Sequence, residues 1–387
     1  MPAPPLQPIV IWFGRVGDMI LLSALLEILH GRYRSGCHVI GAGAWPAQIY
    51  AAHHDVARVT TLHRYTVFLF DGAWWRALRA LRRSRNDPVY VCEYDPRKLA
   101  RIRRLLKLSG INAARCLFIT DTACLEPNVG PSQQGDAPAH WVDRLVCFGR
   151  LTPPGFASTD YPWPSPPPRC APRLEVSEAS STECTRWIEA QGWSGRPLVL
   201  IQPGNRRTMR GRKLRLSAED DKAWPIERWA ALLQKVHARM PQAMIVLCGA
   251  PRESLLLSWI QAAVPLPAVA AAELPLPRLL ALCARAHSMI SVDTGPAHAA
   301  AALSLPLVVM FGAHAQAEWL PRSPDGSAVV GVGGPPHSSR LDQISVETVF
   351  AAWCALPGRG PTAQEPAGAS AESGRPLTPT AARATAP

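Results

Sequence analysis

Apolar residues along this chain gather into short runs that alternate with longer amphipathic stretches. Apolar runs of about 4–8 residues are typical of buried strands, and apolar residues three and four positions apart are typical of helices. The runs predict strands at 8–13, 37–40, 88–92, 197–202, 243–248, 289–292 and 307–311. The amphipathic stretches predict helices at 19–30, 74–85, 97–107, 177–191, 225–239, 276–286 and 297–303, and another that begins at Glu253. Because strands and helices alternate, we expect an α/β protein with parallel, doubly wound sheets.

Proline density divides the chain in two. Residues 153–172 hold the densest interior group of prolines, which excludes regular structure there. We therefore predict an N-terminal domain at 1–152, a linker at 153–172 and a C-terminal domain at 173–356. Residues 357–387 are rich in Pro, Gly, Ala, Ser and Thr and are predicted to be a disordered tail.

Composition excludes several classes of protein. No run of about 18 uncharged apolar residues occurs, and the segment 1–8 lacks the basic start of a signal peptide, so we expect a cytoplasmic protein. The ten cysteines are scattered without a Cys-x-x-Cys pair, which favours reduced thiols over a zinc site or a disulfide framework. His53, His54 and Asp55 are consecutive, and such residues rarely converge on one ion without partners elsewhere, so no metal site is predicted.

A formal net charge of +12 indicates an anionic partner. Arginines and lysines lie on one side of the predicted helices at 74–85 and 97–107. This pattern suits an anionic lipid surface or a phosphorylated glycolipid, and equally suits a solvated face that keeps the protein in solution. Nucleic acid is disfavoured because no recognition motif accompanies the charge.

Candidate chemistry lies where predicted strands end. Asp18 follows the first strand, at the edge of the sheet where α/β proteins bind ligands, although a plain helix cap explains it too. Asp293, Thr294 and Gly295 form a turn before a helix that begins near Pro296. Free N–H groups and the helix dipole make such a turn either an ordinary cap or a site for phosphate.

A nicotinamide cofactor is not predicted, since Gly41-Ala42-Gly43 lacks the third glycine and the acidic partner of a dinucleotide-binding loop. A basic insertion at 206–215 separates the strand that ends near Gly204 from Lys222. By itself, Lys222 is an exposed lysine before a helix, and the insertion is either a phosphate-binding or a solvated loop.

Four segments together resemble glycosyltransferase family 9, the ADP-heptose:lipopolysaccharide heptosyltransferases. They are Arg15-Val16-Gly17-Asp18, Gln202-Pro203-Gly204, Asp221-Lys222-Ala223-Trp224-Pro225, and Ser291 to Ala302 followed by Met310-Phe311-Gly312. The resemblance implies a GT-B architecture, in which two Rossmann-like domains face each other across a cleft. It places the acceptor on the N-terminal domain and the nucleotide-sugar on the C-terminal domain.

The resemblance also implies roles for single residues. Asp18 is similar to the catalytic base, and Lys222 to the lysine that meets the diphosphate, with no metal and no other cofactor. Donor contacts are implied for Gly204, Lys222, Glu253, Asp293, Thr294, Gly295 and His298. Arg15, Arg206 and Arg207 are candidates for contacts to the acceptor or to phosphate.

We therefore expect an inverting, metal-independent transferase that moves heptose from ADP-heptose to a lipopolysaccharide core or a related glycolipid. It would work in the cytoplasm, peripherally on the inner face of the inner membrane. Two alternatives remain: a glycosyltransferase with another nucleotide-sugar or a non-lipid acceptor, and a non-catalytic GT-B relative that binds anionic glycolipid. The sequence leaves the oligomeric state open.

Overall fold

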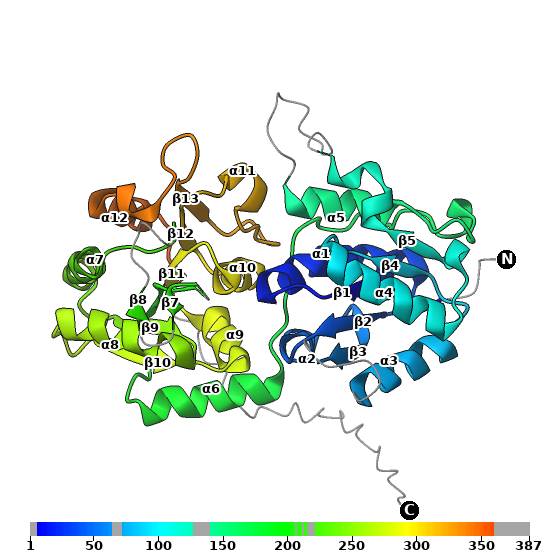
Figure 1. Ribbon diagram of the computed structural model, residues 1–387. Helices are drawn as coiled ribbons and strands as arrows, with labels where there is room; N and C mark the ends of the chain where they lie inside the picture. Colours follow the sequence, from blue (N-terminus) through cyan, green and yellow to red (C-terminus); the bar gives the residue numbers. More distant parts are fainter. Residues whose placement is uncertain are drawn as a thin grey trace, which may run out of the picture.

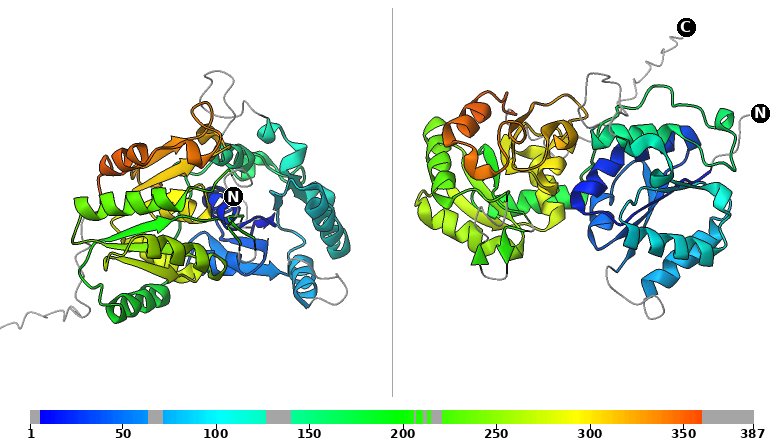
Figure 2. Two further views of the ribbon diagram at one scale, coloured as in Figure 1. Left: turned by 60° about the vertical axis from the view of Figure 1, so that its left-hand side comes forward. Right: turned by 45° about the horizontal axis from the view of Figure 1, so that its top comes forward.

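The computed structural model describes residues 6–63, 72–126, 140–205, 207–210, 213–214 and 221–359 of the 387-residue chain. These residues form two α/β lobes side by side, one from each half of the chain (Figure 1). Each lobe has one parallel sheet with helices on both faces, which confirms the predicted fold class. Figure 2 shows the same division from two further sides.

The N-terminal sheet has the strand order β3-β2-β1-β4-β5. Its strands are β1 (Ile9–Trp12), β2 (Cys37–Ala42), β3 (Val56–Leu62), β4 (Val89–Val91) and β5 (Cys116–Phe118). Its helices are α1 (Val16–Tyr33), α2 (Trp45–Ile49), α3 (Gly72–Arg83), α4 (Pro96–Ser109) and α5 (Trp141–Arg150). One apolar cluster joins the sheet to α1 and α5, and another joins it to α3 and α4, so the two pairs cover opposite faces.

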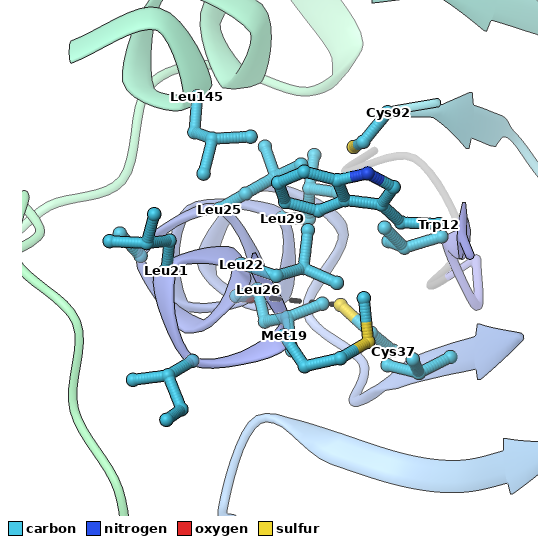
Figure 3. Close-up of a cluster of buried hydrophobic side chains, with 14 of the residues drawn as sticks. Trp12, Met19, Leu21, Leu22, Leu25, Leu26, Leu29, Cys37, Cys92 and Leu145 are labelled. Atoms are coloured by element: carbon cyan, nitrogen blue, oxygen red, sulfur yellow. Dashed lines mark hydrogen bonds between the residues drawn. The ribbon is translucent and has the colours of Figure 1, made fainter. Parts of the chain in front are cut away.

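Helix α1 is the centre of the N-terminal core. Figure 3 shows its leucines packed against Trp12 of β1, Leu145 of α5 and Cys37 of β2. Leu22 and Leu25 are fully buried, and each contributes about 1.5–3 kcal/mol relative to an exposed leucine. The helix therefore holds its first turn, which carries Asp18, in a fixed place at the end of β1.

The C-terminal sheet has the order β10-β9-β6-β11-β12-β13. Its strands are β6 (Leu198–Gln202), β9 (Met244–Gly249), β10 (Val269–Glu273), β11 (Ser288–Val292), β12 (Leu307–Phe311) and β13 (Val329–Gly333). Strands β7 (Met209–Arg210) and β8 (Lys213–Leu214) form a separate antiparallel pair.

Helices cover both faces of this sheet. One apolar cluster includes α7 (Ile226–Arg239), α8 (Ser254–Ala263) and α12 (Val346–Cys354). The cluster on the other face includes α6 (Glu178–Ala190), α9 (Leu276–Arg285) and α10 (Gly295–Ala302). The short helix α11 (Gln316–Trp319) follows β12.

Two sets of contacts join the lobes, one apolar and one ionic. Leu280 of α9 and Ala299 and Ala302 of α10 belong to the same apolar cluster as α1. Beside it, the guanidinium of Arg322 donates to both carboxylate oxygens of Asp143 on α5, at 2.6 and 2.8 Å. These contacts join the two lobes.

The proline-rich stretch lies against the N-terminal lobe. The buried Arg32 guanidinium donates to the carbonyls of Gly149, Leu151 and Tyr161 at 2.6, 2.7 and 3.0 Å, and Ser158–Asp160 makes one short 3-10 turn. The described chain continues three residues beyond the predicted C-terminal domain to Arg359, whose guanidinium donates to four backbone carbonyls. The domain boundaries themselves stay predictions, and residues 360–387 lie outside the described residues.

The structure also differs from the sequence-based expectations. Strands β3, β5, β10 and β13 and helices α5 and α12 were not among the predicted elements; β5 is only three residues long and β3 is partly exposed, so neither gives a clear apolar run. The expectation of reduced thiols is wrong for Cys124 and Cys147, which form a disulfide between residues 23 positions apart. Within the described ranges, none of the helices has both the length and the apolarity needed to cross a bilayer.

Candidate active site

Strand order places a ligand-binding edge on each lobe. In both sheets two neighbouring strands lead into helices on opposite faces: β1 and β4 in the N-terminal sheet, β6 and β11 in the C-terminal sheet. The carboxyl ends of such strands diverge into loops that leave room for ligands. Asp18 follows β1, Gly204 follows β6 and Asp293 follows β11, so the topology brings these predicted residues to such edges.

Asp18 lies in the first turn of α1. Its Oδ2 accepts a hydrogen bond from the backbone N–H of Arg15 at 2.6 Å, so the carboxylate does cap the helix. Burial raises the pKa of the Asp18 carboxyl above its ordinary value, while the Arg15 amide and the charges of Arg15 and Lys98 offset part of that rise. A carboxylate with a raised pKa is a stronger base, so capping and proton abstraction are compatible here.

Glu93 and Lys98 are neighbours of Asp18 that the sequence analysis missed. Glu93 lies two residues after the end of β4 and is 1% exposed; its Oε2 accepts from the Phe13 N–H at 3.2 Å. The Lys98 ammonium lies 3.7 Å from that oxygen and donates to the Phe13 carbonyl at 3.1 Å. Burial raises the pKa of Glu93. The position of Glu93 could have been predicted, because Glu93 follows the apolar run of β4 just as Asp18 follows that of β1.

Two glycines let the lobes meet beside Asp18. A Cβ added to Gly295, at the start of α10, would lie 3.1 Å from the backbone nitrogen of Gly17 and from the Cβ of Val16. A Cβ on Gly17 would lie 3.4 Å from Cδ2 of His298. The first turns of α1 and α10 are therefore in contact, and Asp18 lies next in sequence to a residue that touches His298.

Lys222 and Asp293 form a buried ion pair. The Lys222 Nζ donates to Oδ2 of Asp293 at 2.5 Å and to its backbone carbonyl at 3.0 Å. Their side chains are 12% and 9% exposed. The reading of Lys222 as an exposed surface lysine is therefore wrong, because the lysine is held at the turn that follows β11.

Asp221 fixes the position of Lys222. Its Oδ2 accepts from the Ala313 N–H at 3.1 Å, its carbonyl accepts from the Leu341 N–H at 2.9 Å, and its Oδ1 accepts from Arg207 at 2.8 Å. A Cβ on Gly312 would overlap the Asp221 carbonyl, so a glycine is needed after β12. Arg207 is thus engaged with Asp221, Arg15 is exposed at the start of α1, and Arg206 lies outside the described residues.

Thr294, in the turn before α10, and His298, on α10 itself, each carry a buried polar atom. Within the described part of the chain, neither Thr294 Oγ1 nor His298 Nδ1 has a hydrogen-bond partner. Burial lowers the pKa of His298, with Asp293 and Lys222 acting in opposite directions, so the imidazole is neutral at pH 7. Because buried polar groups normally find partners, these two atoms indicate a polar ligand at the turn.

Glu253 and Gly204 form a second part of the C-terminal edge. Glu253 ends the 3-10 turn Pro251–Glu253 after β9, and its Oε2 accepts from the Ala250 N–H at 2.9 Å. Its Oε1 is buried and makes no hydrogen bond of ordinary geometry among the described residues. Burial raises the pKa of its carboxyl, and the Ala250 N–H and the nearby Gln202 side chain offset part of that rise. A Cβ on Gly204 would overlap Oε1 of Glu253, so the glycine makes room for the carboxylate. A ligand hydroxyl is the natural partner for Oε1.

Comparison with protein families identifies the family to which these site residues belong. The family model for glycosyltransferase family 9 (heptosyltransferase) matches residues 151–343, which include Gly204, Lys222, Glu253 and the turn at Asp293. The chain belongs to glycosyltransferase family 9. The match does not extend to Asp18, so the N-terminal half of the site rests on the geometry described above.

Among curated relatives, this member of glycosyltransferase family 9 is 31% identical over 133 residues to the lipopolysaccharide heptosyltransferase 3 of Escherichia coli. That alignment spans about a third of each protein, 33% of this chain and 35% of the relative. The similarity supports membership of an enzyme family of glycosyltransferases.

Solved structures show the same fold over nearly the whole family 9 chain. A glycosyl transferase of family 9 from Veillonella parvula superposes with a TM-score of 0.66 at 16% identity, covering 91% of this chain and 97% of the other. The ADP-heptose lps heptosyltransferase II of Escherichia coli gives a TM-score of 0.65 at 19% identity, with coverage of 91% and 98%. The two-domain GT-B architecture is thereby established.

Proposed function

We propose that this protein is an inverting heptosyltransferase that moves heptose from ADP-heptose to a lipopolysaccharide core or a related phosphorylated glycolipid. The observation that carries the proposal is the contact between the first turns of α1 and α10. This contact brings Asp18, with its raised pKa, close to His298 on α10 and to the preceding turn, which holds Thr294 and the Lys222–Asp293 pair. Similarity to the lipopolysaccharide heptosyltransferase 3 and the ADP-heptose lps heptosyltransferase II of Escherichia coli supports the heptosyl and ADP parts of the proposal.

The charges of the site residues suggest a role for each of them in the proposed reaction. Asp18 takes the proton of the acceptor hydroxyl, whose oxygen forms a bond to the anomeric carbon of the sugar as the bond from that carbon to the diphosphate oxygen breaks. The bond electrons stay on the diphosphate, which leaves with ADP. The Lys222 ammonium, the Thr294 hydroxyl and the N–H groups at the start of α10 stabilise the growing negative charge.

Binding of the nucleotide-sugar is assigned to the C-terminal edge. We place the ribose hydroxyls at Oε1 of Glu253, an oxygen that fits there because Gly204 has no side chain. We place the sugar hydroxyls at Asp293 and His298. Within the described ranges, three possible metal ligands converge at His30, His54 and Asp55, away from this edge. We propose that Lys222 stabilises the leaving group without a metal or another cofactor.

A nucleotide screen tests the donor assignment. We expect ADP to bind more tightly than UDP or GDP, and ADP-heptose to be consumed with a glycolipid acceptor but not without one. The measurement is calorimetry for binding and chromatography for release of ADP. Tighter binding of UDP or GDP would replace ADP-heptose with another donor, and binding without any transfer would favour a non-catalytic relative.

Glu253→Gln is the matched variant for this screen. The amide keeps an acceptor for the Ala250 N–H but removes the charge on the carboxylate, so ADP affinity should fall by about tenfold, the value of one hydrogen bond to a charged group.

At pH 7 the same Glu253→Gln variant should be at least as stable as the wild type. The reason is that a carboxyl with a raised pKa binds its proton more tightly in the folded chain, so its contribution to stability falls as pH rises above the unfolded value.

For the acceptor, we propose that the N-terminal lobe works peripherally on the anionic inner face of the inner membrane. Helices α3 and α4 expose a row of basic side chains: Arg76, Arg79, Arg82, Arg83, Arg97, Arg101, Arg103, Arg104 and Lys107. Trp75 and Leu108 are 46% and 41% exposed on the same two helices. Arginines with an exposed tryptophan and leucine are what a membrane interface attracts, which favours lipid over a merely solvated face.

Vesicle binding checks this surface. We expect the protein to sediment with vesicles that contain anionic lipid, and to be released as salt rises. Arg79→Glu should weaken binding at least about fivefold, since each basic residue near the surface contributes about 1 kcal/mol. Arg239→Glu, an exposed arginine of α7 on the other lobe, is the matched control. Equal binding to neutral and anionic vesicles would leave these helices as a solvated face.

A further inference from the structure

Three potential metal ligands converge at the end of α1 that lies far from Asp18. The Nδ1 or Nε2 of His30, a ring nitrogen of His54 and a carboxylate oxygen of Asp55 all lie within 4.8 Å of one another. His30 is on the last turns of α1, and the other two residues precede β3. The sequence alone gave no reason to expect an ion at His54 and Asp55, because they lacked a partner elsewhere in the chain, and His30 is that partner.

The contacts within the cluster are close. The His30 Nδ1 and Asp55 Oδ1 are 2.6 Å apart, and the ring centroids of His30 and His54 are 4.9 Å apart. The side chains of His30 and Asp55 are 26% and 14% exposed, and His54 is exposed. Ligand atoms around a tetrahedral ion with bonds of about 2.0–2.1 Å lie about 3.3 Å apart, so ligand atoms now up to 4.8 Å apart need to approach by at most about 1.5 Å.

His53 and Glu175 accept hydrogen bonds from the backbone of Asp55 and His54. The Asp55 N–H donates to Nδ1 of His53 at 3.3 Å, which leaves Nε2 of that ring as the donor to the Arg173 carbonyl at 2.9 Å. The His54 N–H donates to Oε2 of Glu175 at 3.2 Å. Outer hydrogen bonds of this kind orient metal ligands and are a regular part of metal sites.

We propose that His30, His54 and Asp55 bind one Zn²⁺ ion or a similar divalent transition metal, with water at the open side. Two imidazoles and a carboxylate suit Zn²⁺, Co²⁺ and Ni²⁺, and do not suit Mg²⁺ or Ca²⁺, which prefer oxygen ligands alone. The ion joins the end of α1 to the start of β3, next to the segment 173–175 that leads into α6.

The site is structural and independent of sugar transfer. His30 is twelve residues after Asp18, which places it about 18 Å along α1 at a rise of 1.5 Å per residue. It also lies near the amino end of β3, whereas Asp18 lies at the carboxyl edge of the sheet. The proposal therefore stands or falls separately from the metal-independent reaction at Asp18.

Calorimetric titration of the tag-free full chain with Zn²⁺ tests the site. We expect one ion per chain and a rise of a few degrees in Tm with zinc. His54→Ala and His30→Ala should each weaken binding at least about tenfold, the smallest effect usual for a residue that only supports a ligand. Because the His54 side chain is exposed, we expect the His54→Ala variant to have the same Tm as the wild type in the absence of zinc. The variant should also transfer sugar at the wild-type rate.

His337→Ala and Cys354→Ser are the controls, since both residues are exposed and can bind zinc by themselves. Neither change should alter the stoichiometry or the affinity. Zinc binding that survives in His54→Ala, or that disappears in Cys354→Ser, would overturn the assignment. So would the lack of any saturable binding by the wild type.

Discussion

Replacing Asp18 by Asn slows sugar transfer at least about 100-fold, the usual effect of a positioned base, while ADP binding stays within about twofold. The amide oxygen of Asn still accepts the hydrogen bond from the Arg15 N–H, but it cannot take a proton from the acceptor hydroxyl. This expectation separates the two functions of the side chain, helix capping and proton abstraction, and the measurement is the single-turnover rate with saturating ADP-heptose.

Asp18→Ala is a less informative variant, because it removes the cap as well as the base. The lost cap costs about 1 kcal/mol of stability. Asp325→Asn is a matched control, since it makes the same change in an exposed carboxylate that accepts a hydrogen bond from Ser304 on the other lobe. If Asp18→Asn turned over at the wild-type rate, Asp18 would be a helix cap alone.

The wild-type pH profile gives a second check on Asp18. A base acts only when deprotonated, so the rate should fall as pH drops through the pKa of Asp18. Because burial raises that pKa above its ordinary value, the fall should begin at a higher pH than for an exposed aspartate. The Asp18→Asn variant should lose this limb of the profile, whereas the Asp325→Asn control should keep it.

Short-range pattern was enough to place the predicted residues at sheet edges. Asp18 and Asp293 each follow an apolar run and precede a helix, and parallel strands put such positions on one edge. The same rule would have found Glu93 after β4. The contact of Glu93 with the Phe13 N–H could not be predicted, because it depends on the pairing of β4 with β1, which joins residues about 80 positions apart.

Contacts between distant segments could not be predicted in the same way. Lys222 and Asp293 are 71 residues apart, and only the packing of the turn at Asp221 against the ends of β12 and β11 brings them together. The contact of Gly17 with α10 depends on how the two lobes dock, and so does the bond of Arg322 to Asp143. The cysteines show the same limit, since the disulfide joins two separate segments.

The ion pair changes what should be expected of Lys222. Lys222→Met keeps the apolar stem and removes the charge, so ADP affinity should fall by about 10- to 150-fold, the value of a charge-assisted hydrogen bond to the diphosphate. The variant should also lose about 3 kcal/mol of stability, because it leaves the buried carboxylate of Asp293 without its partner. Calorimetry and thermal unfolding measure the two effects separately.

A double-mutant cycle with Asp293→Asn shows whether ADP affinity falls because the Lys222 ammonium is lost or because Asp293 is left unpaired. In Lys222→Met/Asp293→Asn no buried charge is left unpaired, so stability should return to within about 1 kcal/mol of the wild type. ADP affinity should nevertheless remain weak, since the ammonium is still missing. If ADP affinity recovered together with stability, Lys222 would serve only to neutralise Asp293.

Asp293→Asn alone completes the argument about the donor site. The amide leaves the Lys222 ammonium in place and removes a negative charge from beside the diphosphate, so ADP should bind at least as tightly as to the wild type. If Asp293 holds a sugar hydroxyl, kcat/KM for ADP-heptose should fall at the same time. Opposite effects on ADP and on ADP-heptose can arise only where the carboxylate faces the sugar and the ammonium faces the diphosphate, which is the arrangement proposed for the turn before α10.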